Sequence, residues 1–406
     1  MNNPSLIDPM TSSTDLHHRL QRGRLQKMRE QLKKSDCPVG IFYDPVNVRY
    51  VTDVGNMQVY SLHNPCRYVF VAVDGPVILF DFRGCEHLSD HSVVVDEVRA
   101  ARSWYHFNSG PRNHEHVALW ADEIDDLMQQ YASSNKHIAI DKLDPLGANK
   151  LTALGYEIVE GQEVAHLARM IKTPEEIISL KHAVAVCQQG IRNMRNASHP
   201  GRTEQQIWSL LHQTNIEFGG EWIETRLLTS GPRTNPWYQE CSDRVVAAGD
   251  MISVDSDLVG PHGYSADISR SWIVGGEKPD ADQKLLYNMA FEQVQHNCEL
   301  FKAGRSYRDI GKQGWQLPEP YFANMQPAIA HGIGLCNEFP LIFNESYFET
   351  AGFDDELQAG MVFCVESYVG ATGGTEGVKL EQQILVTENG FELLSDLEFE
   401  DDFFSA

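Results

Sequence analysis

The sequence lacks a long run of apolar residues, and it lacks the pattern of a secretory leader. Its apolar stretches are short, as in YVFVAV and VILF. The first residues, MNNPSLIDPMTSSTD, contain no basic region followed by an apolar stretch. We therefore expect no membrane segment and a cytoplasmic protein.

Positive charge is also scarce. The chain has 33 Lys and Arg against 57 Asp and Glu, which gives a formal net charge of -24 at pH 7. Nucleic acids and anionic membranes would both be repelled by such a surface. Neither is expected as a partner, whereas a small cationic substrate is compatible with this charge.

The eight cysteines show neither CxxC pairs nor the spacing of a disulfide framework. Several lie in apolar runs, so we expect most of them to be reduced core residues. No internal repeat is visible at the period of a solenoid.

Length and composition predict two domains, because 406 residues with 42% hydrophobic content can build two substantial cores. We expect a flexible tail at 1–14, an α/β domain at 15–168 and a metal-binding catalytic domain at 169–406. The α/β prediction depends on alternating helical and strand-like segments, namely 16–34, VGIFYD, RYVFVAV, PVILFD, 122–131 and HIAID. The histidines between 106 and 116 are irregularly spaced, so a metal site there is disfavoured.

Helix start signals open the second domain. Thr173, Pro174 and Glu176 supply an N-cap, a proline at the first helical position and a capping-box glutamate. We expect a long helix there and further helices at 200–211, 285–301 and 310–317. These helices should flank a sheet.

The stretch Asp250–Trp272 carries the strongest chemical signal. It predicts a β-hairpin with strands at 251–259 and 267–274 and a turn at 260–263. Side chains alternate along a strand, so Asp255 and Asp257 share a face, and the paired strand can place Asp267 opposite them. Three carboxylates that meet inside a sheet repel one another unless a cation lies between them.

Further candidate ligands follow in the last third of the chain. His331 lies in AHGIGL, where we expect the glycines to let the backbone pass close to a bound group. Glu366 ends MVFCVE, and Glu381 lies in the strand-like VKLEQQILV. Carboxylates with one imidazole suit Mn, Fe, Co or Zn, and bridging carboxylates hold paired ions. The predicted ligands of two divalent ions are Asp255, Asp257, Asp267, His331, Glu366 and Glu381.

This ordered set resembles the pita-bread metallopeptidase superfamily (M24), which includes methionine aminopeptidases, prolidases and creatinases. The resemblance implies an α+β fold, with a C-terminal pita-bread catalytic domain preceded by a smaller α/β creatinase-type domain. It also implies a homodimer. In the peptidases the hairpin aspartates are eleven positions apart, which here would pair Ser256 with Asp267. Aspartates on both sides of Ser256 instead resemble the dimethylsulfoniopropionate lyases of the DddP type, which implies iron, with Zn, Mn, Co or Ni also possible.

The peptidase histidines are absent. The places where these peptidases carry two further histidines fall in Pro236–Cys241 and Cys336–Glu338, and neither contains one. The resemblance therefore implies a metal-dependent lyase that cleaves dimethylsulfoniopropionate to dimethyl sulfide and acrylate by β-elimination. The alternative is an Xaa-Pro dipeptidase or aminopeptidase, or another small-amide metallohydrolase. A metal-free scaffold is disfavoured because every ligand position is filled.

The proton acceptor is a departure from the lyases. Asn337 occupies the place of their proposed base, an aspartate, and an amide cannot accept a proton at neutral pH. Asn337 then orients the substrate, and Glu338, Tyr238 or Tyr264 removes the proton, or the substrate is different. A cationic sulfonium also favours aromatic faces. The predicted aromatic contacts are Trp222, Trp237 and Tyr264.

Overall fold

The computed structural model describes residues 6–10 and 13–404 and divides into two compact units. One unit is Ser13–Arg169, and the other combines Met1–Ser12 with Met170–Ala406. The predicted boundary and the observed one differ by one residue. Within the described residues, no helix is long and apolar enough to span a membrane.

The N-terminal residues belong to the larger unit. Of the predicted flexible tail, 1–5 and 11–12 lie outside the described residues. Met10 is buried, and the Asp8 carboxylate pairs with Nε2 of His262 at 2.9 Å. Residues 8–10 therefore have defined contacts with the unit that also contains residues 170–406.

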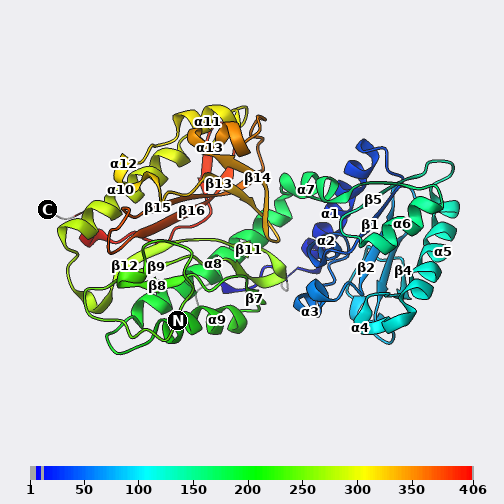
Figure 1. The fold of residues 1–406 in the computed structure, drawn as a ribbon, viewed down its shortest axis with the longest axis horizontal. Helices are drawn as coiled ribbons and strands as arrows, with labels where there is room; N and C mark the ends of the chain where they lie inside the picture. The colour runs from blue at the N-terminus through cyan, green and yellow to red at the C-terminus, as the bar shows by residue number, and fades with distance from the viewer. Residues whose placement is uncertain (1–5, 11–12, 405–406) are drawn as a thin grey trace. The chain divides into compact units, whose positions relative to one another are not determined.

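The unit of residues 13–169 is built on a mixed six-stranded sheet with the order β4-β3-β2-β1-β5-β6 (Figure 1). The strands are β1 Val39–Phe42, β2 Tyr68–Ala72, β3 Val77–Asp81, β4 Glu97–Ala100, β5 His137–Ile140 and β6 Glu157–Glu160. The helices are α1 Thr14–Lys34, α2 Pro45–Thr52, α3 Gln58–His63, α4 His106–Ser109, α5 Asn113–Tyr131, α6 Pro145–Ala153 and α7 Gly161–Met170. Apolar residues of the central strands and of α5 form its core.

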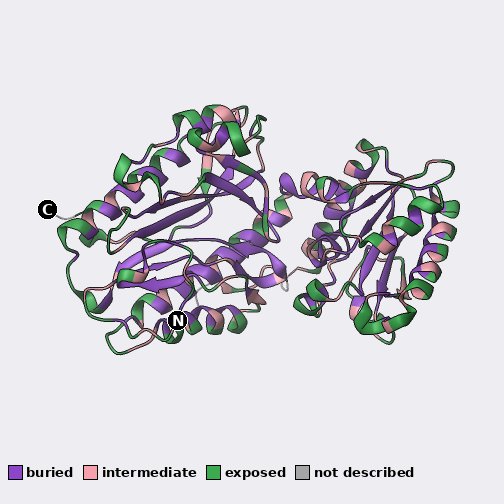
Figure 2. Cartoon of the chain, in the orientation of Figure 1, coloured by how far each residue is buried: buried purple, intermediate pink, exposed green. Residues whose placement is uncertain are grey.

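The unit that contains residues 170–406 has strands between helices. Figure 1 shows α8 and α9 on one side of the strands and α10 to α13 on the other. The antiparallel sheets are β14-β13-β15-β16-β17, β12-β9-β8 and β11-β10-β7. Most of their strands are buried, although β17 is largely exposed and β14 is partly exposed, and the helices expose an outer side (Figure 2). The chain is therefore α+β, as predicted.

The bounds of these elements follow. The helices are α8 Pro174–Asn196, α9 Glu204–Glu217, α10 Ala281–Cys298, α11 Tyr307–Gln313, α12 Glu319–Phe322 and α13 Glu345–Ala351. The first strands are β7 Trp222–Ile223, β8 Leu228–Ser230, β9 Met251–Val254, β10 Leu258–Val259, β11 Ser265–Ala266 and β12 Arg270–Ile273. The last strands are β13 Ala328–Ile333, β14 Asn337–Phe343, β15 Val362–Val369, β16 Val378–Val386 and β17 Phe391–Leu393.

The start of α8 confirms the predicted capping box. Oγ1 of Thr173 accepts from the Glu176 amide at 3.2 Å, and the Glu176 carboxylate accepts from the Thr173 amide at 2.9 Å. The two bonds satisfy amides that a helix end leaves without intrahelical partners. The helices expected at 200–211, 285–301 and 310–317 are present as α9, α10 and α11, with bounds shifted by a few residues.

The hairpin differs from the prediction in two respects. The strand expected at 251–259 is interrupted, because residues 255–257 separate β9 from β10. The second arm begins earlier than expected, with β11 at 265–266, and residues 267–269 separate β11 from β12. All three hairpin aspartates lie in these interruptions. The backbone of these aspartates bonds outside the hairpin ladder, with the Asp255 amide on the Leu227 carbonyl and the Asp267 amide on the Gln383 side chain.

Candidate metal centre

The two halves of the hairpin keep one register across the interruptions. Val254 pairs with Arg270 on one side, and Leu258 pairs with Ala266 on the other. Counting inward from either pair places residue 257 opposite residue 267. The hairpin therefore brings Asp257 and Asp267 together, as predicted.

Ser256 joins the interrupted strands. Its buried Oγ donates to the Ala266 carbonyl at 3.1 Å and accepts from the Ile268 amide at 2.9 Å. Asp257 then takes a left-handed φ of 36°. The serine side chain replaces ladder bonds that the interruption removes, and the aspartates on either side of it turn toward the same site.

The five-stranded sheet supplies the other candidate ligands. His331 of β13 pairs with Cys364 of β15, and Glu366 of β15 pairs with Glu381 of β16. Cross-strand partners lie on the same face, as do residues two apart in one strand. These four side chains therefore face the same side of the sheet.

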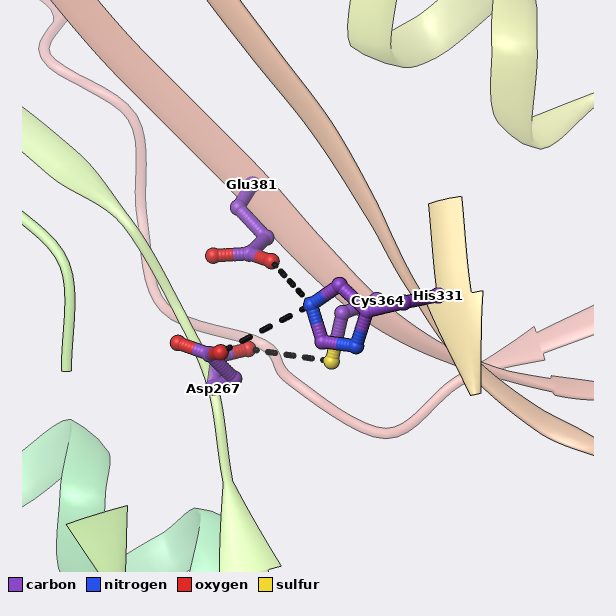
Figure 3. A group of neighbouring side chains, drawn as sticks. All are labelled: Asp267, His331, Cys364 and Glu381. Atoms are coloured by element: carbon purple, nitrogen blue, oxygen red, sulfur yellow. Dashed lines mark hydrogen bonds and ion pairs between the residues drawn. The ribbon is translucent and has the colours of Figure 1, made fainter. Parts of the chain in front are cut away.

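The candidate ligands form two groups that share Asp267. Ligand atoms of Asp255, Asp257 and Asp267 lie within 4.8 Å of one another, and those of a second group do so as well. The second group, drawn in Figure 3, is Asp267, His331, Cys364 and Glu381. In it, Nε2 of His331 lies 3.7 Å from Oε1 of Glu381 and 3.8 Å from Oδ2 of Asp267. The shared aspartate is positioned to bridge two ions.

Cys364 and Glu366 depart from the predicted ligand set. The sequence analysis did not identify Cys364, although alternation along VFCVE places it on the face of Glu366. Glu366 belongs to neither group formed by the described residues. Its carboxylate instead accepts from a lysine.

The electrostatics of the cluster favour a bound cation. Burial, together with the charges of Asp257 and Glu381, raises the pKa of Asp267 well above its usual value. Burial likewise raises the pKa of Asp257. His331 is buried, yet its hydrogen bond with Glu381 and the charge of Glu366 raise its pKa to about 9. Asp257, Asp267 and His331 retain their protons more strongly because several carboxylates lie close together. A metal ion would reduce the repulsion between these carboxylates.

One buried atom supports the same conclusion. Among the described residues, Oε1 of Glu381 accepts no hydrogen bond of normal length, and Nε2 of His331 lies 3.7 Å away. A buried carboxylate oxygen with only a long contact is costly, because it has lost its hydration. Oxygen atoms with one imidazole and one thiol are a donor set that divalent transition metals accept. The residues present therefore fit such ions.

Lys379 is a second functional candidate, after Cys364, that the sequence did not predict. It is completely buried, and its Nζ lies 2.9 Å from Glu366 Oε2, 3.4 Å from Asp255 Oδ2 and 3.5 Å from Glu381 Oε2. Burial alone would lower the pKa of Lys379, but Asp255 and Glu366 raise it well above its usual value. Period-two alternation could have indicated it, because Lys379 precedes Glu381 by two positions in a strand.

The glycines of AHGIGL let two strands approach closely. A Cβ on Gly332 would lie 2.7 Å from the Phe339 carbonyl oxygen, and one on Gly334 would lie 2.5 Å from the Glu338 carboxylate. The backbone therefore passes close to β14 of its own sheet, and the expected approach to a bound group stays a prediction. This close approach fixes the strand that carries His331.

Two of the predicted catalytic residues lie near the cluster. Nδ2 of Asn337 is 3.5 Å from Oδ1 of Asp257, and Asn337 is exposed. Tyr238 is also exposed, and its hydroxyl donates to Gln326 at 2.8 Å. Desolvation of part of its side chain and the charge of Glu366 raise the pKa of Tyr238.

The structure does not bring Glu338 and Tyr264 into the ligand groups. Glu338 is buried and accepts from Nζ of Lys172 at 2.7 Å. The hydroxyl of the buried Tyr264 donates to Glu176 of α8 at 3.3 Å. Both side chains are thus engaged in contacts that stabilise the unit.

The two tryptophans lie in packing positions. Trp237 is buried in a small cluster with Leu227 and Tyr368, and its ring centroid is 5.7 Å from that of Tyr368. Trp222 lies in β7, where it pairs with Val259 and is partly buried. Their predicted contacts with substrate therefore stay predictions.

Comparisons with known proteins show the family of the chain. A model of metallopeptidase family M24 matches residues 179–388. The chain is 37% identical to the dimethylsulfoniopropionate lyase DddP of Roseovarius nubinhibens, over 94% of this chain and 87% of the relative. It is also 37% identical to DddP of Roseobacter denitrificans, over 89% of this chain and 82% of the relative. Among solved structures, an Xaa-Pro dipeptidase from Bacillus anthracis matches 94% of this chain and 99% of its own, with a TM-score of 0.75 and 20% identity.

Proposed function

The chain belongs to metallopeptidase family M24, and within that family we propose that it is a carbon-sulfur lyase that cleaves dimethylsulfoniopropionate to dimethyl sulfide and acrylate. The observation that carries the proposal is the 37% identity to two DddP lyases over about nine-tenths of the chain. The aspartates on both sides of Ser256 and the absence of histidine in 236–241 and 336–338 agree with it.

The reaction is a β-elimination that balances without water or a redox partner. A base removes a proton from the carbon next to the substrate carboxylate, and the electron pair left behind forms the carbon-carbon double bond. The bond from the β-carbon to sulfur breaks, and its electrons leave with neutral dimethyl sulfide. Divalent ions at the centre would polarise the substrate carboxylate and so make the transferred proton more acidic.

We propose that the ions are held by the six predicted ligands. Lys379 contacts Oε2 of Glu366 in the described structure, so an ion and the lysine would compete for the charge of this carboxylate. The donor set suits iron, which the resemblance to DddP favours, and it also accommodates Zn, Mn, Co or Ni. The proposed ligands are Asp255, Asp257, Asp267, His331, Glu366 and Glu381.

We propose that Tyr238 accepts the proton as a phenolate. Partial burial and the charge of Glu366 raise the pKa of this phenol, and cations held at the centre would lower it. Glu338 and Tyr264 are the other candidates, and their contacts with Lys172 and Glu176 hold them in the protein interior. The Tyr238 side chain is exposed to solvent and lies within the electrostatic reach of Glu366. Asn337 then acts as a positioning residue, because its amide donates to Asp257.

The proposed partner is a small cationic carboxylate, with Trp222, Trp237 and Tyr264 retained as proposed aromatic contacts. A net charge of -24 favours such a ligand over nucleic acid or an anionic membrane. We also propose a cytoplasmic location and a homodimer, and the homodimer rests on resemblance to the family alone.

The assay that tests the function uses two substrates. Purified protein is incubated with dimethylsulfoniopropionate and, separately, with Xaa-Pro dipeptides, and dimethyl sulfide and free proline are measured. We expect dimethyl sulfide with negligible proline. The Asp267→Ala variant is the control, because Asp267 belongs to both ligand groups. Efficient proline release without dimethyl sulfide would instead assign the protein to the peptidases of the family.

A further inference from the structure

Lys379 is a positive charge placed inside the candidate metal centre. Besides its contacts with Glu366, Asp255 and Glu381, its Nζ donates to Oγ of Ser269 at 3.0 Å. Its neighbours therefore include three of the six proposed ligands. A buried lysine needs such compensation, because it has lost its hydration.

The charges of the cluster identify what Lys379 contributes. The five proposed carboxylate ligands and this one ammonium together carry four negative charges, which two divalent ions would neutralise. Without the ions, the Lys379 ammonium is the positive charge that attracts the carboxylates of Asp255 and Glu366. With the ions bound to the same carboxylates, the ammonium repels them.

We infer that Lys379 is an internal cation that competes with metal ions for Glu366 and Asp255. It holds the ion-free centre together, and it weakens the binding of ions on its side of the centre. The position of Glu366 is the main evidence for this competition. Glu366 contacts the lysine and lies outside both ligand groups formed by the described residues. The inference requires the proposed metal centre but not the lyase reaction.

The test is the binding of cobalt(II) to the full-length chain after chelation. Calorimetry should show that Lys379→Met binds the weaker cobalt ion about tenfold or more tightly than the native chain, because a unit charge a few ångströms away is removed. The ion-free variant should melt at a lower temperature, because the carboxylates then repel one another. A lysine that only supports the fold would give the opposite change in affinity, since its loss would loosen the ligands.

Two further variants separate charge from packing. Lys172→Met removes a second buried lysine, whose Nζ lies 2.7 Å from Glu338, a carboxylate outside the ligand groups. It should lower the melting temperature without tightening cobalt binding. Lys379→Arg keeps the charge and should keep the cobalt affinity within a few-fold of the native value.

A Glu366→Gln background keeps the test decisive if Lys379→Met does not fold without ions. Loss of the Glu366 charge reduces the repulsion among the carboxylates of the ion-free centre. Lys379 still contacts Asp255 in this variant, so adding Lys379→Met should tighten cobalt binding, by a smaller factor than in the native chain. Unchanged or weaker cobalt affinity after Lys379→Met, in both the native chain and the Glu366→Gln chain, would overturn the inference. Cobalt affinity equal to that of the native chain in Asp267→Ala would instead overturn the proposed centre. The lyase assay does not enter either comparison.

Discussion

Tyr238 and Asn337 are two single residues on which the path of the proton depends. The tyrosine is exposed, with its hydroxyl on Gln326, and the asparagine amide lies beside Asp257. The sequence indicated both residues through resemblance. It could not show that Glu338 is engaged with Lys172, because these residues are 166 positions apart and meet only in the folded chain.

Tyr238→Phe removes the proposed proton acceptor and little else. We expect turnover of dimethylsulfoniopropionate to fall by about 10²-fold or more, since a positioned base commonly contributes 10²–10⁴-fold. KM should change little, and steady-state kinetics separate the two parameters. Turnover close to the native value would remove Tyr238 from the reaction.

Asn337→Asp places a carboxylate 3.5 Å or so from that of Asp257. We expect weaker substrate binding with no gain in turnover, because the new negative charge faces the carboxylates of the centre and of the substrate. Steady-state kinetics across a range of pH test this expectation. Turnover that instead rises by about a hundredfold or more would assign the base to position 337 and not to Tyr238.

At the scale of elements, the hairpin could be predicted in its pairing but not in its interruptions. Period-two alternation and the turn residues were sufficient to place Asp257 opposite Asp267. The interruptions at 255–257 and 267–269 depend on hydrogen bonds of Ser256 to residues across the hairpin, which no local pattern encodes. The start of α8 could be predicted to the residue, because a capping box is local.

Ser256→Ala tests whether the serine shapes the site. Two buried hydrogen bonds are lost, so we expect a loss of about 1–3 kcal/mol in the free energy of unfolding and weaker ion binding. Urea unfolding and metal content measure the two effects. The matched control is Ser253→Ala, whose buried hydroxyl bonds Ser271 and the Gly377 carbonyl away from the ligands. It should lose stability while keeping its ions, and an equal loss of ions from both variants would contradict the role of Ser256.

At the scale of the whole molecule, the centre belongs to one unit. All the candidate ligands lie between residues 255 and 381, within the unit that contains residues 170–406. Length and composition predicted two domains, and the helix start signals at Thr173 and Pro174 were the basis for the predicted boundary. They could not predict that residues 8–10 fold with the C-terminal unit, because that contact joins distant parts of the sequence.

Removal of the ions should therefore affect the two units differently. We expect chelation to increase amide hydrogen exchange in β9, β12, β13, β15 and β16, since their facing carboxylates then repel one another. Exchange in the sheet of residues 13–169 should stay unchanged. Mass spectrometry of peptic fragments measures both, and an equal increase in both units would show that the ions stabilise more than the unit that binds them.

The pairing of Asp8 with His262 also has a consequence for biosynthesis. The partners are 254 positions apart, and the whole of the Ser13–Arg169 unit is synthesised between them. At about 5–20 residues per second, translation takes roughly 13–50 s to supply the histidine after the aspartate. During that interval Asp8 has no native partner at position 262, while residues 13–169 leave the ribosome as an uninterrupted unit.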